Sequence, residues 1–281
     1  MSKLHVAAIQ LNTTGDVQAN NAQIEEMVRQ VAGEGVSFVS LPEAANILLR
    51  DNLRYPSVCV PEAEDTTLAL CRRLARELGI WIHAGSLLVR HENGQRIWNR
   101  AYLIAPSGDV VATYDKLHTF DVKLGGAADF QESAAVAPGE GGAVVVDMGD
   151  FRLGLSICYD IRFSYLFDAL AGVGANVMMI PASFSTATGP LHWEALLKAR
   201  AIETGSYVIA AAQCGEREGV RVYGQSRIIS PFGEVIAAAG DDPCVIMAEV
   251  DSAVVAATRH RLPTLLQRRE IGTPRVIMAR P

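Results

Sequence analysis

Residues 151–165 read Phe-Arg-Leu-Gly-Leu-Ser-Ile-Cys-Tyr-Asp-Ile-Arg-Phe-Ser-Tyr, and this stretch decides the fold. Up to position 157, large apolar residues alternate with smaller or polar ones, which predicts a strand with one buried face. After Cys158 the apolar residues follow helical spacing, and Asp160 is suited to cap a helix over 161–170. The pattern places Cys158 at a turn from strand to helix, partly exposed and close to backbone N–H groups that stabilise a thiolate. Because most free cysteines are small buried apolar residues, the rest of the chain has to decide between a structural and a reactive thiol.

The composition predicts a folded protein without nucleic-acid or membrane partners. The 281 residues are 49% hydrophobic and 20% charged, enough to bury a sizeable core. The net charge of −6 argues against binding to nucleic acid or an anionic membrane, and no apolar run is long enough to span a bilayer. The five cysteines show no CxxC spacing, so neither a disulfide framework nor a metal site is expected. No signal-peptide pattern precedes the first expected strand, and we expect a cytoplasmic protein.

Apolar periodicity and turn residues predict two successive sets of strands and helices. In the first set, strands are expected over residues 4–11, 36–41, 80–89, 97–105 and 109–116, with helices over 17–32 and 68–78. In the second set, strands are expected over 151–157, 176–180, 207–213, 224–230 and 234–239, with helices over 161–170 and 190–204. Residues 44–62 are expected to be irregular. Residues 117–142 are expected to form a glycine-rich connection of a length that is usually functional or disordered.

The two sets are internally related. Ala-Pro-Ser-Gly-Asp-Val-Val-Ala at 105–112 matches Ser-Pro-Phe-Gly-Glu-Val-Ile-Ala at 230–237, and an apolar strand ending in proline occurs at both Leu41-Pro42 and Ile180-Pro181. Two such halves, each a sheet covered by helices on one face, predict an α/β fold in the form of a four-layer α-β-β-α sandwich with a pseudo-twofold duplication. No change in composition separates the halves, so a single domain over 1–281 is expected.

Three polar residues are expected at strand ends: Glu43, Lys116 and Cys158. A charged residue at a strand end is usually just solvated. Together, however, the three supply a nucleophile, a base for its proton and a cation for an oxyanion, which are the parts that acyl transfer through a cysteine needs. A cysteine–histidine pair is the alternative. His118 and His192 stand in polar neighbourhoods, but we interpret both as structural or loop-positioning groups.

Three blocks of the chain resemble the signature motifs of the nitrilase-like carbon–nitrogen hydrolases. These blocks are Leu-Pro-Glu at 41–43, Tyr-Asp-Lys-Leu-His-Thr-Phe-Asp at 114–121 and Gly-Leu-Ser-Ile-Cys-Tyr-Asp-Ile-Arg-Phe at 154–163. The resemblance implies the four-layer sandwich, with Cys158 as nucleophile, Glu43 as general base and Lys116 as oxyanion cation. It also implies a fourth catalytic residue, Glu132, and an oxyanion donor in the Tyr159 N–H. The implied reaction is hydrolysis of a small carboxylic acid amide through a thioester, with no metal and no cofactor.

The resemblance extends to substrate and assembly. Residues 189–204 and 210–215 are most similar to the branch containing deaminated glutathione amidase and omega-amidase, which implies a 2-oxo dicarboxylic acid monoamide as substrate. The candidate substrate-binding residues are Lys123, Arg162, Phe184 and Thr188. Lys123 and Arg162 are the candidate cations for the substrate carboxylate, Lys123 because it adds a positive charge to the loop expected over the pocket, whereas Arg162 also fits a structural role. Lys-Leu-Gly-Gly-Ala-Ala at 123–128 departs from that branch, which usually has an acidic residue and Pro-Gly there. Family members commonly form homodimers or larger homo-oligomers, and the segment from about 252 to 281 is expected at such contacts.

Other activities are open at this point. An N-carbamoyl-amine hydrolase or a nitrilase would use the same residues on the same fold. A catalytically silent binding protein on this fold would be expected to lack Glu43, Lys116 or Cys158, and all three are present.

Overall fold

The first half of the chain, joined by one strand from near the C-terminal end, builds one sheet with two helices on its outer face. In the computed structural model, which describes residues 2–126 and 129–278, the strands lie in the order β17-β1-β2-β3-β5-β4, and β6 pairs with β5. The strands are β1 (Lys3–Gln10), β2 (Phe38–Ser40), β3 (Trp81–His83), β4 (Leu87–Arg90), β5 (Ile97–Ile104), β6 (Val110–Asp115) and β17 (Cys244–Asp251). The helices are α1 (Val17–Gly33) and α3 (Thr66–Leu78).

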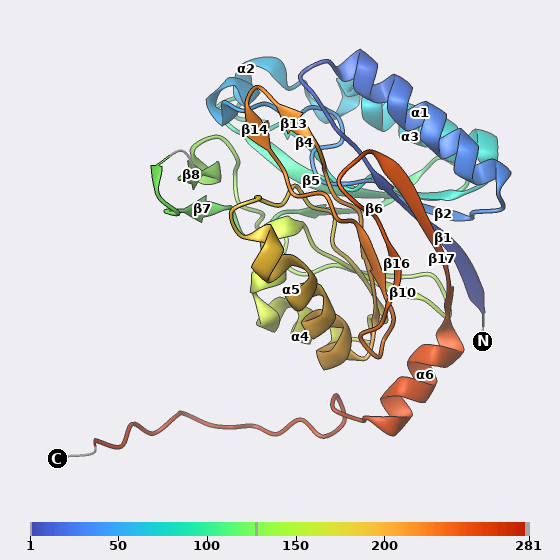
Figure 1. Cartoon of the computed structure of the whole chain (residues 1–281), viewed down its shortest axis with the longest axis vertical. Helices are drawn as coiled ribbons and strands as arrows, with labels where there is room; N and C mark the ends of the chain where they lie inside the picture. Colours follow the sequence, from blue (N-terminus) through green and yellow to red (C-terminus); the bar gives the residue numbers. More distant parts are fainter. Residues whose placement is uncertain (1, 127–128, 279–281) are drawn as a thin grey trace.

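The second half builds an equivalent sheet. Its strand order is β16-β15-β12-β11-β10-β9. The strands are β9 (Val145–Asp147), β10 (Arg152–Leu155), β11 (Val177–Met179), β12 (Tyr207–Ala210), β15 (Arg227–Ile229) and β16 (Val235–Ala238). The helices are α4 (Ser164–Gly172) and α5 (Gly189–Thr204). Figure 1 shows α1 and α3 on one side of the molecule and α4 and α5 on the other, with the two sheets between them.

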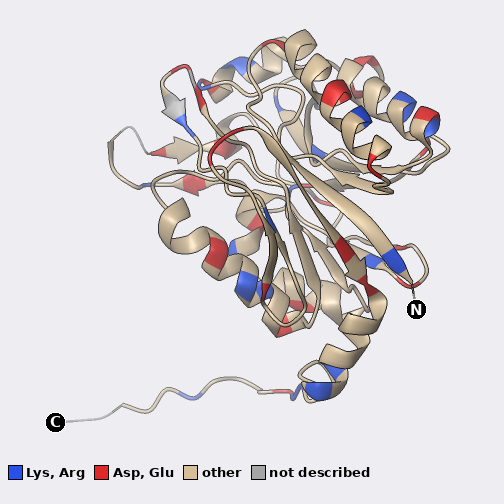
Figure 2. Ribbon diagram, turned by 45° about the vertical axis from the view of Figure 1, so that its right-hand side comes forward, with Lys and Arg blue, Asp and Glu red and all other residues tan. Residues whose placement is uncertain are grey.

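The predicted four-layer sandwich is confirmed by how the core is divided. Val6 and Ala8 of β1 belong to the apolar core that the two sheets share. Ala7 and Ile9, the alternate residues of the same strand, belong to the core beneath α1 and α3. A strand buried on both faces reads as a continuous apolar run, as this one does. Along the outer helices, positively and negatively charged residues are interspersed (Figure 2).

The predicted duplication is visible in two matching hairpin turns. In the β5–β6 turn, the Ala105 N–H donates to the Asp109 carbonyl at 2.9 Å and the Gly108 N–H donates to the Ala105 carbonyl at 2.8 Å. In the β15–β16 turn, the corresponding bonds run from Ser230 to Glu234 and from Gly233 to Ser230, at 2.8 and 2.9 Å. Both hairpins also carry a register shift one residue before the turn.

Two predicted boundaries are wrong for reasons of tertiary packing. The strand expected over 80–89 is broken at Gly85, whose φ is +62° and whose missing Cβ would lie 2.1 Å from the Pro42 carbonyl oxygen. A glycine is required there because another backbone passes against it. The helix expected from residue 161 begins only with α4, after a 3-10 helix, η5 (Cys158–Arg162). Asp160 caps η5 rather than α4, because its carboxylate accepts a hydrogen bond from the Ile157 N–H at 2.9 Å.

Segments expected to be irregular contain short elements. Residues 44–62 include η1 (Asn52–Arg54), α2 (Tyr55–Val58) and the start of η2 (Glu62–Glu64). The connection 117–142 contains a two-strand hairpin, β7 (Asp121–Val122) and β8 (Phe130–Gln131), followed by η4 (Glu132–Ala134). Strands β9 and β17, the hairpin β13 (Glu216–Arg217) and β14 (Val220–Arg221), and helix α6 (Ser252–Arg261) were not predicted.

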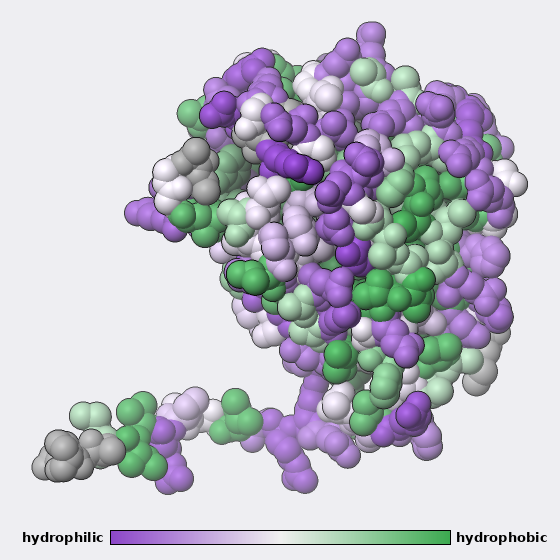
Figure 3. All heavy atoms as spheres, viewed as in Figure 1, coloured by the Kyte–Doolittle hydropathy of each residue, from purple (hydrophilic) through white to green (hydrophobic). Residues whose placement is uncertain are grey.

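Beyond α6, residues 262–278 form an extended tail whose first part stays against the second half. Leu265 packs on the core, Thr264 Oγ1 donates to the Glu203 carbonyl at 3.4 Å, and Arg268 forms an ion pair with Asp168 of α4. Farther along, the tail extends away from the two sheets (Figures 1 and 3). Its large apolar side chains, Leu266, Ile271, Val276, Ile277 and Met278, are each more than four-fifths exposed. No helix in the described part of the chain is long and apolar enough to cross a membrane.

Candidate active site

A cavity of about 360 Å³ lies between the two halves, and its floor is formed by the ends of the central strands. Glu43 follows β2, Lys116 follows β6, and Cys158 follows β10 as the first residue of η5. The three residues predicted from strand ends all line this cavity, as does Glu132 from the long connection. The parallel strands β1 and β2 of one sheet and β10 and β11 of the other end at this edge, which brings the distant blocks together.

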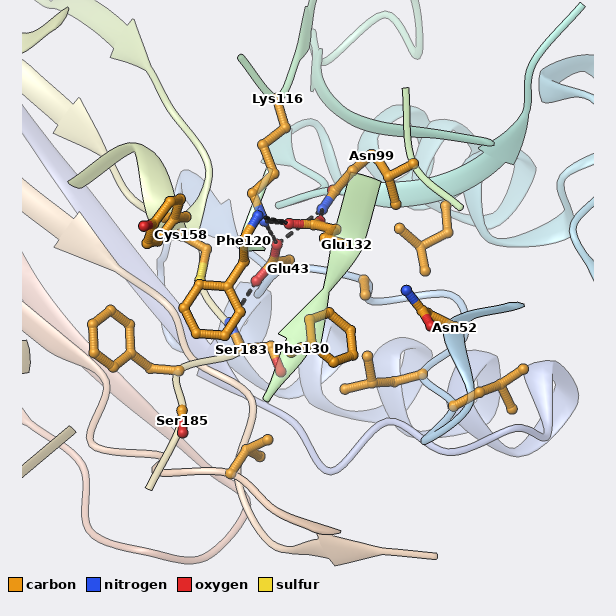
Figure 4. A pocket seen from close by; sticks show the side chains of 18 of the residues that line it. Glu43, Asn52, Asn99, Lys116, Phe120, Phe130, Glu132, Cys158, Ser183 and Ser185 are labelled. Atoms are coloured by element: carbon orange, nitrogen blue, oxygen red, sulfur yellow. Dashed lines mark hydrogen bonds and ion pairs between the residues drawn. The ribbon is translucent and has the colours of Figure 1, made fainter. Parts of the chain in front are cut away.

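Lys116 is held between two carboxylates. Its Nζ lies 2.8 Å from Glu43 Oε1, 2.9 Å from Glu132 Oε1 and 2.8 Å from Glu132 Oε2. Figure 4 shows the ammonium group between the two carboxyl groups. Burial alone would lower the pKa of Lys116, but the charges of Glu132 and Glu43 outweigh it and raise the pKa well above its usual range. Lys116 is therefore a fixed positive charge in a site that excludes most water.

Cys158 is not the exposed thiolate that its position at the turn predicts. Its residue is 7% exposed, and its thiol forms a hydrogen bond with Glu43. Burial and the negative charge of Glu43 raise the pKa of the Cys158 thiol well above its usual range, although the Lys116 charge acts in the opposite direction. The resting thiol is therefore protonated. A base therefore has to remove the thiol proton when Cys158 attacks. Glu43 is suited to this role because its carboxylate contacts the thiol.

The Glu43 carboxylate has donors on both oxygens. Besides Lys116, Oε1 accepts a hydrogen bond from Asn99 Nδ2 at 2.8 Å, and Oε2 accepts one from the Ser183 backbone N–H at 2.8 Å. Burial would raise the pKa of Glu43, but the Lys116 charge and the hydrogen bonds from Lys116, Cys158 and Asn99 hold it below its usual range. Glu43 is thus ionised and ready to accept a proton at neutral pH.

Asn99 and Ser183 are site residues that the sequence analysis missed. Asn99 lies on β5, where the buried positions Ile97, Asn99 and Ala101 alternate with more exposed ones. A polar residue in an otherwise apolar alternating set is a signal that the sequence contained. Ser183 contributes only a backbone N–H, which no side-chain pattern reveals.

The turn that carries Cys158 is held rigidly by Asp160. The Asp160 carboxylate accepts hydrogen bonds from the Tyr114 hydroxyl at 2.7 Å and the His118 backbone N–H at 3.1 Å, and His118 Nδ1 lies 2.7 Å from it. His118 thus contacts the turn and not the thiol, as its interpretation as a positioning group expects. Cys158 itself has a φ of +47°, which is uncommon for a residue with a side chain.

Tyr159 offers the next donor in the turn. Among the residues that the structure describes, its backbone N–H has no hydrogen-bond acceptor. N–H groups in the first turn of a helix point outward without an intrahelical partner. The Tyr159 N–H is therefore available to an oxyanion formed at Cys158.

Arg162 supplies a positive charge to the wall of the cavity. Its guanidinium lies 3.0 Å from His192 Nδ1 and donates to Thr188 Oγ1 at 3.3 Å, and it stacks over the Tyr159 and Phe184 rings. No carboxylate within the described ranges forms an ion pair with Arg162. Arg162, Phe184 and Thr188 all line the cavity, as their predicted role in binding substrate requires.

Lys123 does not join this group. Its side chain is exposed in the β7–β8 connection, and it is not among the residues that line the cavity. The loop is anchored by Glu132 and the Phe120 N–H, which leaves position 123 on the outer side. The expectation that Lys123 contacts a substrate at this site is therefore not supported by its position. Within residues 2–126 and 129–278, no group of three metal-ligating side chains is assembled.

The chain is similar to known proteins over nearly its whole length. Residues 5–260 match the family described as carbon–nitrogen hydrolase. The chain is 38% identical to the deaminated glutathione amidase of Homo sapiens over 94% of its length and 82% of that protein, and 32% identical to omega-amidase NIT2 of Danio rerio over 96% of each.

Solved structures show the same fold. The NitFhit protein of C. elegans superposes with a TM-score of 0.88 at 31% identity, covering 96% of this chain and 66% of that one. A mutant amidase from Nesterenkonia sp. AN1 superposes with a TM-score of 0.79 at 25% identity, covering 95% and 94%. In that amidase structure the acetamide moiety of fluoroacetamide is added covalently at the active-site cysteine.

Proposed function

The chain belongs to the carbon–nitrogen hydrolase family, and from this premise we propose that it hydrolyses a small carboxylic acid amide through a thioester on Cys158. It is a hydrolase of carbon–nitrogen bonds other than peptide bonds. The observation that carries the thioester proposal is the unbroken chain of contacts from the Cys158 thiol through Glu43 to Lys116 and Glu132.

The first half-reaction forms the thioester. Glu43 accepts the thiol proton as Cys158 Sγ attacks the amide carbon, and the resulting oxyanion lies between Lys116 and the Tyr159 N–H. When this intermediate collapses, the carbon–nitrogen bond breaks and Glu43 transfers its proton to the departing amine. A general base and a pre-positioned oxyanion donor each contribute about 10²- to 10³-fold or more to such steps.

The second half-reaction consumes water. Glu43 accepts a proton from the water that attacks the thioester carbon. The carbon–sulfur bond then breaks, Cys158 recovers its proton from Glu43, and the carboxylic acid leaves. Glu132 keeps Lys116 in place throughout, because it binds the ammonium group with both of its oxygens.

The substrate we propose carries a carboxylate remote from the scissile amide. A half-buried cation without an acidic partner favours binding of an anion, and an arginine fork fits a carboxylate with two hydrogen bonds. Arg162, with Thr188 beside it, is in that position. A 2-oxo dicarboxylic acid monoamide or deaminated glutathione has this chemistry, and both substrates fit the names of the similar amidases.

The test is to incubate the protein with three matched sets of compounds: acidic monoamides, N-carbamoyl amines and nitriles. Release of ammonia or amine from the amides, together with an acyl adduct on Cys158 detected by mass spectrometry, is the expected result. Release of carbon dioxide with ammonia, or turnover of nitriles alone, would replace the amidase proposal with one of the two alternatives. Absence of any adduct on Cys158 would overturn the thioester.

We also propose that the protein works as a homodimer or larger homo-oligomer in the cytoplasm. The extended tail 262–278 exposes five large apolar side chains that a second copy of the chain would cover. A catalytic thiol is preserved by reducing surroundings. Sedimentation of the full chain against a chain ending at residue 261 tests the assembly, since loss of the tail should shift the protein toward monomer.

A further inference from the structure

Lys116 has no N–H to spare in the resting site. A lysine ammonium group has three donors, and three carboxylate oxygens lie within 2.9 Å of Lys116 Nζ, namely Glu43 Oε1 and both oxygens of Glu132. For Lys116 to stabilise an oxyanion, it has to withdraw one donor from a carboxylate. A buried carboxylate oxygen left without a donor would make that step costly.

Each of these three oxygens has a second donor. Glu132 Oε2 accepts a hydrogen bond from the Phe120 backbone N–H at 2.6 Å. The other two are served by a single side chain, because Asn99 Nδ2 donates to Glu43 Oε1 at 2.8 Å and to Glu132 Oε1 at 3.3 Å. Figure 4 shows the Asn99 amide beside both carboxyl groups, on the side away from Cys158.

The environment of the Asn99 side-chain oxygen, Oδ1, indicates that Asn99 does not serve to stabilise the fold. Asn99 is 3% exposed, and its Oδ1 is buried without a hydrogen-bond partner among the described residues. An unpaired buried acceptor costs stability that an apolar side chain of the same shape would avoid. The amide cannot turn over to satisfy Oδ1, because that would point the oxygen at two carboxylates.

We propose that Asn99 is a positioning residue that holds Glu43 and Glu132 in place while Lys116 turns one N–H toward the oxyanion. This inference rests on the proposed amidase mechanism and adds a fifth member to its polar group. Asn99 reaches this position through backbone pairing, since its carbonyl accepts the Lys116 N–H at 3.0 Å at the end of the β5–β6 ladder. Asn99 does not touch the reacting atoms, and it acts only through Glu43, Glu132 and Lys116.

The test replaces Asn99 with leucine, which keeps the shape and removes both ends of the amide. The kcat for an acidic amide should fall about 10- to 100-fold. The KM should stay nearly unchanged, because Arg162, the residue proposed to bind the substrate carboxylate, is untouched. The acid limb of the kcat/KM profile should move to higher pH by about one unit, since Glu43 loses a donor that favours its ionised form. The titratable groups facing Glu43 are Lys116, Glu132, Cys158 and Tyr55, and all are retained.

The matched control is Asn20→Leu. Asn20 is another asparagine 3% exposed, but both ends of its amide are satisfied by Thr14 and Asn46, and it is not among the residues that line the cavity. Asn20→Leu should lower the melting temperature and leave the pH profile of kcat/KM unchanged. Asn99→Leu should shift the acid limb of that profile and should not lower the melting temperature. If Asn99→Leu does not fold, Asn99→Ala serves the same comparison.

A second readout separates this inference from the amidase proposal. The rate at which iodoacetamide alkylates Cys158, followed by mass spectrometry across pH, needs no amide hydrolysis and reports the removal of the thiol proton, for which Glu43 is the proposed base. An upward shift of its acid limb in Asn99→Leu supports the inference even if every amide tested fails as a substrate. A folded Asn99→Leu with wild-type kcat and an unshifted acid limb in both assays would overturn it.

Discussion

The two halves of this molecule share a backbone plan but not their residues at the strand ends. Strand β2 of the first sheet and β11 of the second are each followed, two residues after the strand ends, by a proline, Pro42 and Pro181. The next residue is Glu43 in the first half and Ala182 in the second, and both are buried at the same edge. The duplicated frame therefore offers the same position twice, and only one copy carries the base.

In the neighbouring strands, β1 and β10, it is the second half that carries the functional residue. Val6 of β1 and Leu153 of β10 occupy equivalent pairing positions against β2 and β11. Counting the same distance along the chain from each reaches Leu11 in the first half and Cys158 in the second. The base thus comes from one half and the nucleophile from the other, so the site exists only where the halves meet. The predictions below test this division of labour between the halves.

The largest effect is expected from removing the nucleophile. Cys158→Ala should lower kcat by about ten-thousand-fold or more. The fold should stay intact, because an apolar residue, Leu11, is buried at the equivalent position of the first half. Ammonia release and the circular dichroism of the folded protein measure the two parts. Cys71→Ala, at a fully buried cysteine of α3, is the control and should reduce stability without reducing kcat. Loss of activity on alkylation of a different cysteine, with Cys158 unmodified, would contradict the assignment.

The next effect concerns groups that act as one unit. Glu43→Gln should lower kcat about 10²- to 10⁴-fold and Lys116→Ala about 10²- to 10³-fold, because each breaks the same chain of contacts. The double variant should be little worse than the worse single variant. Steady-state kinetics of the three variants measures this directly. Multiplication of the two losses would show that Glu43 and Lys116 act independently, and the shared site would then be wrong.

The chemistry of this edge could be predicted from the sequence, but its hydrogen bonding could not. Glu43, Lys116 and Cys158 each follow a strand whose apolar pattern is local, so their places at strand ends were predictable. That the three meet at one edge was suggested only by the chemistry that they complete together. The Ser183 N–H and the Asn99 amide reach Glu43 from segments 140 and 56 residues away in the chain. No local pattern encodes such contacts.

The same distinction explains the errors in the fold. The strand expected over 80–89 breaks at Gly85 because the Pro42 carbonyl oxygen lies 2.1 Å from the place where a Cβ would be. The run of apolar residues in the sequence gives no sign of this close approach. The exposure of Cys158 was predicted from its place at a turn. The turn is in fact covered by the cavity walls of both halves, so the thiol is buried and protonated.

A smaller effect is expected at the substrate end, where Arg162 of the second half lines the cavity close to Cys158. Arg162→Gln should raise KM for an acidic amide about 10- to 100-fold and leave KM for a neutral amide of equal length nearly unchanged. Lys123→Ala, an exposed cation of the first half, is the control and should change neither value. Initial rates with the two amides measure the difference. Equal increases for both amides in Arg162→Gln would show that Arg162 does not bind the carboxylate.

The smallest effect is on stability alone, at the two matching hairpin turns. Gly108 and Gly233 have φ values of +82° and +90°, so alanine at either position is strained by about 1 kcal/mol or more. Their surroundings differ, however. A Cβ at position 108 would lie 2.7 Å from the backbone carbonyl oxygen of Arg72, whereas at 233 it would meet the movable end of the Ile202 side chain at 2.8 Å. Gly108→Ala should therefore lower the free energy of unfolding more than Gly233→Ala, by about a further 1 kcal/mol, with kcat unchanged in both. Urea unfolding of the two variants measures the order. The reverse order would mean that the first hairpin shifts away from α3 more easily than α5 repacks its Ile202, and that the turns match in sequence but not in rigidity.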